Sequence, residues 1–127
     1  MEFKKIEEMI GRTFTDVKQV DKETIVFRKD VPGGYTTFEF YHIQDCCEDV
    51  SIEDVCGDLR DLEFSPILTA EVCTKQDDTV CGTWTFYRFQ TVKGTVTIRW
   101  YGESNGYYSE EVSIMKTEVR ESLLMPA

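Results

Sequence analysis

The sequence contains few of the residues that hold nucleic acid through its phosphates. Of its 127 residues, 14 are lysine or arginine and 24 are aspartate or glutamate, so the formal net charge is −10. Duplex nucleic acid is bound mainly through many Lys and Arg contacts to phosphate. The charge therefore argues against duplex nucleic acid as a partner. A small anionic ligand needs only a few local donors and stays compatible with an acidic protein.

Long apolar runs and a signal sequence are also missing. No stretch approaches the roughly 20 apolar residues that a membrane-spanning helix needs, and the charged beginning, MEFKKIEEMIG, does not have the pattern of a signal peptide. We expect no membrane partner and a cytoplasmic location. The hydrophobic content of 41% is sufficient for a core, and the length predicts a single domain over residues 1–127.

The cysteines do not form a recognisable framework. Their number, five, is odd, and no C-x-x-C pair occurs. His42, Cys46, Cys47 and Cys56 suggest zinc, but adjacent Cys46 and Cys47 would point in opposite directions in an extended segment. The pattern favours free thiols and no metal site. A glycine loop of the Walker or dinucleotide type is also missing, so we expect no cofactor.

Support for catalysis is weak, because the chain has one histidine. His42, Asp45 and Cys46 can be drawn as base, orienting group and nucleophile, but nothing in the sequence fixes their geometry. The acidic residues between 48 and 63 lack the ligand spacing of a calcium loop. We therefore predict a protein that is not an enzyme and has no catalytic residues.

Periodicity predicts an α+β, mostly β fold with an N-terminal helix followed by about seven antiparallel strands. The helix covers residues 2–10, with Phe3, Ile6 and Ile10 on one face and Gly11 at its end. The expected strands cover about residues 13–20, 24–28, 35–42, 67–74, 81–91, 95–102 and 107–115, and residues 50–55 are a candidate for one more. Residues 57–62 are expected to form a loop or one helical turn, 75–79 a polar loop, and 117–125 a helical turn or two.

The stretch Thr83–Tyr108 predicts two consecutive hairpins. With a three-residue loop at 104–106, Val96 lies opposite Ile114 and Ile98 opposite Val112, which makes an apolar face and sets Arg99 against Glu111 on the other. With Lys93-Gly94 as a two-residue loop in the first hairpin, Phe89 lies opposite Ile98 and Tyr87 opposite Trp100. A loop longer by one residue would instead turn Trp84 and Phe86 into the core.

The first of these registers places aromatic rings and two arginines on one exposed face. Like charges on neighbouring strands repel, so a partner should offset Arg88 and Arg99. A structural ion pair with Glu111 is one interpretation. An anionic ligand is the other, because flat rings stack on a base while guanidinium groups bind phosphate oxygens. The predicted ligand-binding residues are Arg88, Arg99, Trp84, Phe86, Tyr101 and, from the adjacent turn, Asn105.

Several segments resemble a group of small acidic proteins common in bacteriophages and prophages: FYHIQDCCEDVSIEDVCGDL (40–59), Pro66-Ile67, GTWTFYRF (82–89) and VTIRWYGESNGYYSE (96–110). More loosely, the chain is similar to the Thoeris anti-defence sponges. Those phage proteins sequester cyclic ADP-ribose isomers, and some also hold cyclic oligonucleotides. The resemblance implies a multimeric, β-rich protein with an N-terminal helix that binds its ligand at subunit interfaces without cleaving it.

The sequence thus leads to a hypothesis with one alternative from another class. The hypothesis is a phage-encoded, homo-oligomeric protein of the host bacterial cytoplasm that binds and sequesters a small cyclic nucleotide immune signal. The alternative is an acidic inhibitor that blocks a host protein by surface mimicry. A nucleotide-processing enzyme that uses His42 is a third reading.

Overall fold

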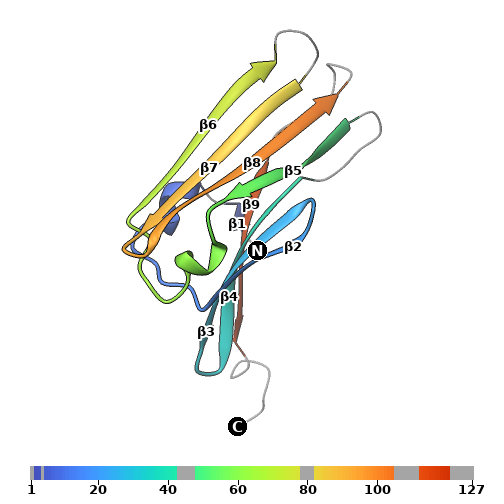
Figure 1. The fold of residues 1–127 in the computed structure, drawn as a ribbon. Coiled ribbons are helices and arrows are strands. Elements are labelled where there is room, and N and C mark those ends of the chain that lie inside the picture. Colours follow the sequence, from blue (N-terminus) through green and yellow to red (C-terminus); the bar gives the residue numbers. More distant parts are fainter. Residues whose placement is uncertain (1, 4, 43–47, 78–81, 105–111, 121–127) are drawn as a thin grey trace.

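Two antiparallel sheets make up the structure, a computed structural model that describes residues 2–3, 5–42, 48–77, 82–104 and 112–120 (Figure 1). The first sheet contains, in spatial order, β1 (Glu2–Phe3), β9 (Ser113–Arg120), β4 (Gly34–Tyr41), β3 (Thr24–Val31) and β2 (Asp16–Asp21). The second contains β5 (Glu48–Cys56), β8 (Gly94–Ser104), β7 (Gly82–Thr91) and β6 (Thr69–Asp77). Two 3-10 turns complete the described elements, η1 (Ile6–Met9) and η2 (Leu59–Leu62).

The mostly β class is confirmed, but the predicted N-terminal helix is wrong. Within the described ranges the chain has no α-helix. In the segment predicted as a helix, Glu2–Phe3 pair with β9 as β1, and only the four residues of η1 form a 3-10 turn. Ile6 and Met9, three residues apart, are buried, whereas Ile10 is 46% exposed. So short a helix is marginal in isolation, and the first residues instead gain backbone hydrogen bonds at the edge of a sheet. Gly11 follows the C-cap residue Ile10 of η1 and has a φ of 86°.

The strands fall close to the predicted ranges, with two differences in the second half of the chain. The stretch predicted as a polar loop, 75–79, continues β6 as far as Asp77, and 78–79 lie outside the described residues. The last strand, predicted over 107–115, is described over Ser113–Arg120, so the start of the predicted C-terminal helix is strand. Residues 107–111 and 121–125 lie outside the described residues. The turn predicted at 57–62 corresponds to η2.

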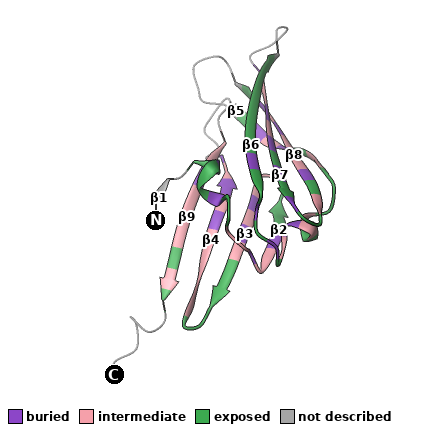
Figure 2. Ribbon diagram, turned by 90° about the vertical axis from the view of Figure 1, so that its left-hand side faces the viewer, coloured by how far each residue is buried: buried purple, intermediate pink, exposed green. Residues whose placement is uncertain are grey.

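A single hydrophobic core fills the space between the two sheets (Figure 2). Phe27 of β3 lies near its centre, with its ring centroid 5.2 Å from that of Phe14, 5.5 Å from Phe40 and 4.9 Å from Phe89. Phe89 belongs to β7, so these ring contacts connect the two sheets. Aromatic pairs at such separations add to the free energy gained from burial alone. Trp100 of β8 is also in this core, at 1% exposed.

The predicted pairing of β8 with the last strand is wrong. β8 pairs with β7 and β5, whereas β9 pairs with β4 and β1 in the other sheet. The opposition of Val96 to Ile114 was inferred from apolar alternation, and both residues are indeed buried. They face the same core from opposite sheets. Alternation shows which side of a strand is buried but not which strand lies beside it.

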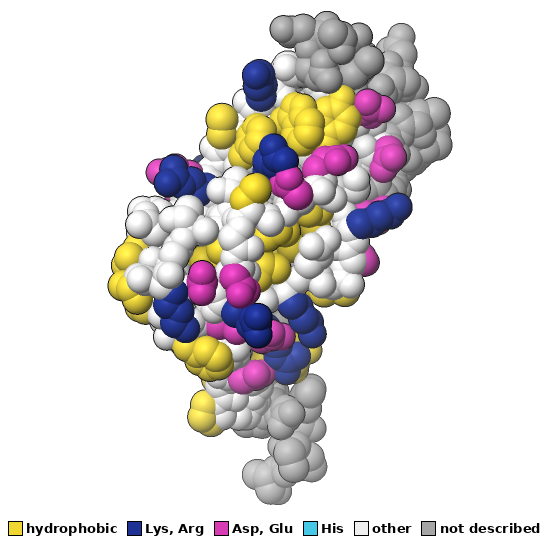
Figure 3. Space-filling view, viewed as in Figure 1, with side chains coloured by type: hydrophobic (Ala, Val, Ile, Leu, Met, Phe, Trp, Pro, Cys, Tyr) yellow, Lys and Arg dark blue, Asp and Glu magenta, His cyan; other side chains and the backbone are white. Residues whose placement is uncertain are grey.

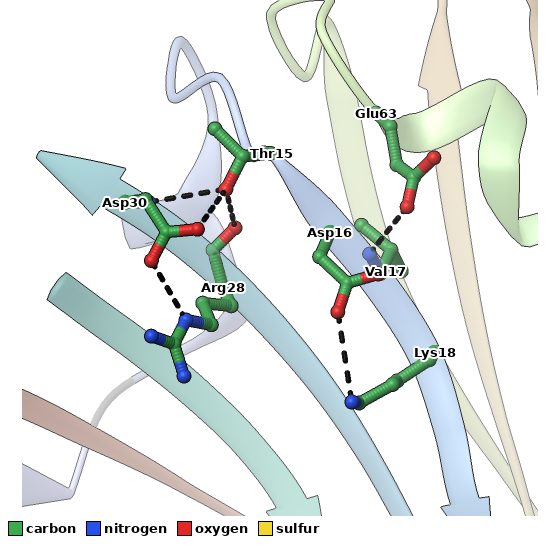
Figure 4. Close-up of polar contacts among 7 residues, drawn as sticks. All are labelled: Thr15, Asp16, Val17, Lys18, Arg28, Asp30 and Glu63. Carbon is green, nitrogen blue, oxygen red and sulfur yellow. Dashed lines mark hydrogen bonds and ion pairs between the residues drawn. The ribbon is translucent and has the colours of Figure 1, made fainter.

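Polar contacts hold β2 between β3 and the segment after η2 (Figure 4). Thr15 Oγ1 donates to the Arg28 carbonyl at 3.1 Å and accepts from the Asp30 amide at 3.0 Å. The Val17 amide donates to a carboxylate oxygen of Glu63 at 2.9 Å. Backbone groups at an edge strand are satisfied in this way by side chains as well as by its neighbour. These contacts fix the edge of the first sheet at the start of β2, the end away from the β2–β3 turn.

Candidate functional site

The outer surface of the second sheet carries the predicted aromatic cluster. The β7–β8 register places Trp84 opposite Tyr101, Phe86 opposite Arg99 and Arg88 opposite Thr97. The hairpin loop is therefore Val92-Lys93, closed by Thr91 and Gly94, and the predicted Lys93-Gly94 loop is wrong. The loop moves by one residue, and the pairing of β7 with β8 therefore shifts by two residues. Because two is an even number, the same side chains stay on the same face. We call Trp84, Phe86, Arg88, Arg99 and Tyr101 the aromatic face.

Three rings of the aromatic face lie against one another. The Trp84 and Phe86 rings are stacked, with centroids 6.1 Å apart and planes at 13°, and the Tyr101 centroid lies 4.7 Å from that of Trp84 at 52°. All three side chains are partly exposed. In the space-filling view, hydrophobic side chains form a patch on this sheet with acidic and basic side chains directly beside it (Figure 3). The three rings thus form one continuous apolar surface that is partly exposed to solvent.

Arg99 is paired with Asp54 of β5. Its Nε donates to Asp54 Oδ1 at 2.5 Å, and an Nη donates to Asp54 Oδ2, so the contact is bidentate. The hydrogen bond from Arg99 lowers the pKa of the Asp54 carboxyl, and the same contact raises the pKa of the guanidinium. The Arg99 Cζ also lies 5.9 Å from the centre of the Trp84 ring. The predicted partner, Glu111, lies outside the described residues.

A β-bulge in β5 brings Asp54 to this position. The β5–β8 register shifts between Ile52 and Asp54, so Asp54 lies opposite Arg99. Without this shift, the register that sets Ser51 opposite Tyr101 would put Glu53 opposite Arg99. The sequence gives no signal for a bulge here, and for this reason sequence reasoning missed Asp54.

Arg88, the second predicted arginine, is exposed. Its neighbours across the sheet are Thr97 on β8 and Glu71 on β6. β6 also sets Cys73 beside Phe86 and Lys75 beside Trp84. Sequence reasoning left these β6 side chains out because part of β6 reads as a polar loop, although alternation over 69–77 could have revealed them. The face therefore has Arg88, Lys75 and Arg99 as cations around its rings.

Gly82 gives the Tyr101 ring room to lie flat on the sheet. A Cβ built on Gly82 would be 2.9 Å from Tyr101 Cζ and closer still to its Oη. The Tyr101 hydroxyl also contacts a carboxylate oxygen of Glu103 at 3.1 Å. Glycine is thus required for close approach of a side chain rather than for an unusual φ. This fixes the position of one ring of the aromatic face.

The other residues considered in the sequence are not brought to this face. Asn105, predicted to bind ligand, lies outside the described residues, as do Asp45 and Cys46. His42 is buried at the end of β4, in the other sheet. Cys56 and Cys73 are exposed free thiols. Among the residues that the structure describes, no three His, Cys, Asp or Glu side chains are grouped so that they could hold a metal ion.

Comparison with known families assigns the chain to one of them. A family model described as a domain of unknown function, DUF7448, matches residues 5–114. The chain belongs to the DUF7448 family. The match includes the whole second sheet, so the aromatic face lies within the part shared with this family. No curated protein and no solved structure matches the chain.

The DUF7448 domain also has a pocket between its two sheets, on the side where β6 and β9 form the rims. Its volume is about 410 Å³. Apolar side chains and the Tyr87 ring line most of it, and Lys5 and Glu7 add charge; the lining residues are Lys5, Ile6, Glu7, Val72, Tyr87, Val112, Ser113 and Ile114.

The part of the domain that the structure describes contains no helix with the length and apolar character of a membrane span.

Proposed function

We propose that this DUF7448 protein binds a small cyclic nucleotide signal and withholds it without cleaving it, as a phage-encoded anti-defence protein. The observation that supports this most is the aromatic face, where stacked rings adjoin guanidinium groups on an exposed sheet surface. Rings on a sheet surface bind bases by stacking, at about 1–3 kcal/mol per base. The class of ligand follows from the resemblance of this chain to the Thoeris anti-defence sponges.

The two arginines have different parts in such a complex. Asp54 already occupies one edge of the Arg99 guanidinium, so a phosphate must share or displace that carboxylate. Arg88 is exposed, and of the two arginines it is the one that a phosphate reaches without displacing Asp54. Trp84 and Phe86 provide the stacking surface beside it. Binding is therefore expected to depend more on Arg88 than on Arg99.

A sponge must hold its ligand without turnover. The aromatic face is made of rings and guanidinium groups, and the side chains next to it are the paired Asp54 carboxylate, Glu71, Cys73 and Lys75. His42 follows β4 of the other sheet. General acid–base catalysis needs a group with a suitable pKa within hydrogen-bond reach of the reacting atom. The lowered pKa of Asp54 makes it a poor general base. The composition of the face supports binding rather than cleavage.

Isothermal titration tests the proposal directly, with cyclic ADP-ribose isomers and cyclic di- and trinucleotides as ligands. After binding, the protein is denatured by heat and the released ligand is identified by mass spectrometry. We expect intact ligand, and weaker binding by Arg88→Gln than by Lys29→Gln, a matched loss of an exposed cation on the first sheet. Altered ligand would show an enzyme. Absence of binding to every nucleotide would refute the proposal.

Inhibition of a host protein by surface mimicry is the second candidate. It is favoured by the Asp54–Arg99 pair, which lowers the net positive charge of the face, and by the acidic net charge of −10. Trp, Tyr and Arg are also the residues that most often dominate the energy of protein interfaces. A flat apolar surface with a charged rim suits such a contact. Binding to no nucleotide would favour this reading.

A further inference from the structure

The strand β6 leaves one of its edges open. It is the last strand of the second sheet, and no described strand pairs with its other side. Its residues Glu71–Gln76 are all exposed, and β6 is coloured as exposed along most of its length (Figure 2). Val72 is 46% exposed although it alternates with the outward-facing residues. An exposed edge of this kind presents unpaired N–H and C=O groups to another strand.

The other sheet edges in the described part of the chain are interrupted or covered. The register shifts between Gln19 and Asp21 in β2 and between Ile52 and Asp54 in β5, and β1, a strand of two residues, covers β9 at Met115 and Lys116. Such bulges and covers are the means by which proteins prevent pairing at edges. β6 pairs with β7 over nine consecutive residues, 69–77, without a shift, and contains neither proline nor glycine. It is the edge best suited to accept a strand.

The hairpin register shows which backbone groups point to the open edge. A two-residue loop closes on a hydrogen-bonded pair, here Thr91 and Gly94. Odd-numbered residues of β7 therefore bond to β8 and even-numbered ones to β6, because bonded and non-bonded pairs alternate. In β6 the odd-numbered residues then bond to β7. Ala70, Val72, Thr74 and Gln76 direct their N–H and C=O groups outward.

We propose that β6 pairs antiparallel with β6 of a second copy of this chain, about a two-fold axis midway between the two Cys73 residues. Val72 then exchanges both backbone hydrogen bonds with the partner's Thr74, and Thr74 with the partner's Val72. Cys73 lies opposite the partner's Cys73 in a non-bonded pair, where side chains are closest. The interface is isologous, as a two-fold dimer requires.

Charge selects this register. With the axis at Cys73, Glu71 lies opposite the partner's Lys75, and Lys75 opposite the partner's Glu71. Opposite charges in directly facing positions stabilise a strand pair, and like charges destabilise it. An axis at Glu71 or at Lys75 would bring like charges together. An axis at Val72 or at Thr74 would leave both residues without an opposite charge facing them.

The pairing would join the two second sheets into one continuous sheet. The two-fold axis is perpendicular to the plane of the joined sheet, so the same face of both copies lies on the same side. The two aromatic faces would therefore lie on a single surface, separated by the two β6 strands. Lys75, which lies beside Trp84 in its own chain, would stand between the two clusters. The pairing itself involves no ligand, so it does not depend on the proposed function.

Charge reversal tests the pairing by sedimentation equilibrium without nucleotide. The wild type is expected to dimerise. Glu71→Lys and Lys75→Glu each create two like-charge contacts in place of two attractive ones, and each should raise the dimer dissociation constant by about tenfold or more. The double variant Glu71→Lys/Lys75→Glu restores opposite charges and should dimerise like the wild type. An equimolar mixture of the two single variants should form a mixed dimer.

A thiol cross-linker provides an independent measurement. A short bis-maleimide should join two copies through Cys73, and the cross-linked dimer should be absent in Cys73→Ser but retained in Cys56→Ser, the matched exposed thiol. Circular dichroism checks that every variant is folded. A wild type that stays monomeric at its highest soluble concentration would overturn the proposal. So would a dimer whose dissociation constant is unaffected by both single charge reversals.

Discussion

Replacing Trp84 by alanine is the sharpest perturbation of the aromatic face. Trp84 contacts two rings, with centroid distances of 6.1 Å to Phe86 and 4.7 Å to Tyr101. Each aromatic pair is worth about 0.5–1.5 kcal/mol beyond its buried area, and the ring is only partly buried. We therefore expect Trp84→Ala to lower the free energy of unfolding by about 1–2 kcal/mol, which is less than the roughly 3–5 kcal/mol of a buried aromatic.

The same substitution should affect nucleotide binding more strongly than stability. Loss of one stacked base costs about 1–3 kcal/mol, which corresponds to a dissociation constant raised by about five- to 150-fold. Trp84→Phe keeps a flat ring at this position and should retain most of the affinity. A stacking role thus predicts a large difference between the two variants, whereas a merely structural role would affect both through stability alone.

Intrinsic fluorescence reports on this residue because the two tryptophans differ in environment. Trp84 is partly exposed, whereas Trp100 is 1% exposed in the core. A stacked base should quench Trp84 and leave Trp100 unaffected, so Trp84→Phe should abolish the quenching while titration calorimetry still detects binding. If Trp84→Ala is folded and binds a cyclic nucleotide as tightly as the wild type, the stacking argument is refuted.

Three further predictions concern the core, the position of Tyr101 and the acid limb of stability. Phe27→Ala should lower the free energy of unfolding by about 3–5 kcal/mol in urea titrations, because a fully buried ring that connects both sheets leaves a cavity; an effect as small as that of Lys29→Ala would contradict the described core. Gly82→Ala should weaken nucleotide binding in calorimetry while the protein remains folded, because the new Cβ displaces the Tyr101 ring; unchanged affinity would remove Tyr101 from the site. Because Arg99 lowers the pKa of Asp54, this pair should stabilise the fold above about pH 4, the value of an unfolded aspartate, and lose its contribution as the pH falls through the lower folded pKa. Thermal melts between pH 2 and 5 should therefore show a shallower acid limb for Asp54→Asn than for the wild type, and identical slopes would argue against the ion pair.

Local pattern was sufficient to predict most strands and the content of the aromatic face. Alternation depends on the geometry of one strand, so it places Trp84, Phe86 and Arg88 together whatever strand lies alongside. The error of one residue in the hairpin loop shifts the register by two residues, so it did not change which side chains lie on the face. The buried residues Val96, Ile98 and Ile114 followed from the same period.

Pairing between distant strands was not accessible in the same way. β8 and the strand after it were expected to pair because they are consecutive, yet β9 pairs with β4, more than 70 residues earlier in the chain. Both pairings bury the same apolar side chains, so the sequence does not distinguish them. The bulge that brings Asp54 to Arg99 leaves no local signature either. The N-terminal helix failed for a related reason, because the edge of β9 offers hydrogen bonds that a short helix cannot match.

The Asp54–Arg99 pair bears on what the aromatic face can select. A guanidinium held on two nitrogens by a carboxylate keeps its position beside the Trp84 ring before any ligand arrives, so little side-chain entropy is lost there on binding. The same carboxylate repels a phosphate placed close to Arg99 and leaves Arg88 as the preferred anchor. A ligand that stacks on Trp84 and directs its phosphate toward Arg88, away from Asp54, satisfies both conditions. Removing the repulsion with Asp54→Asn should therefore favour anionic ligands that the wild-type face discriminates against.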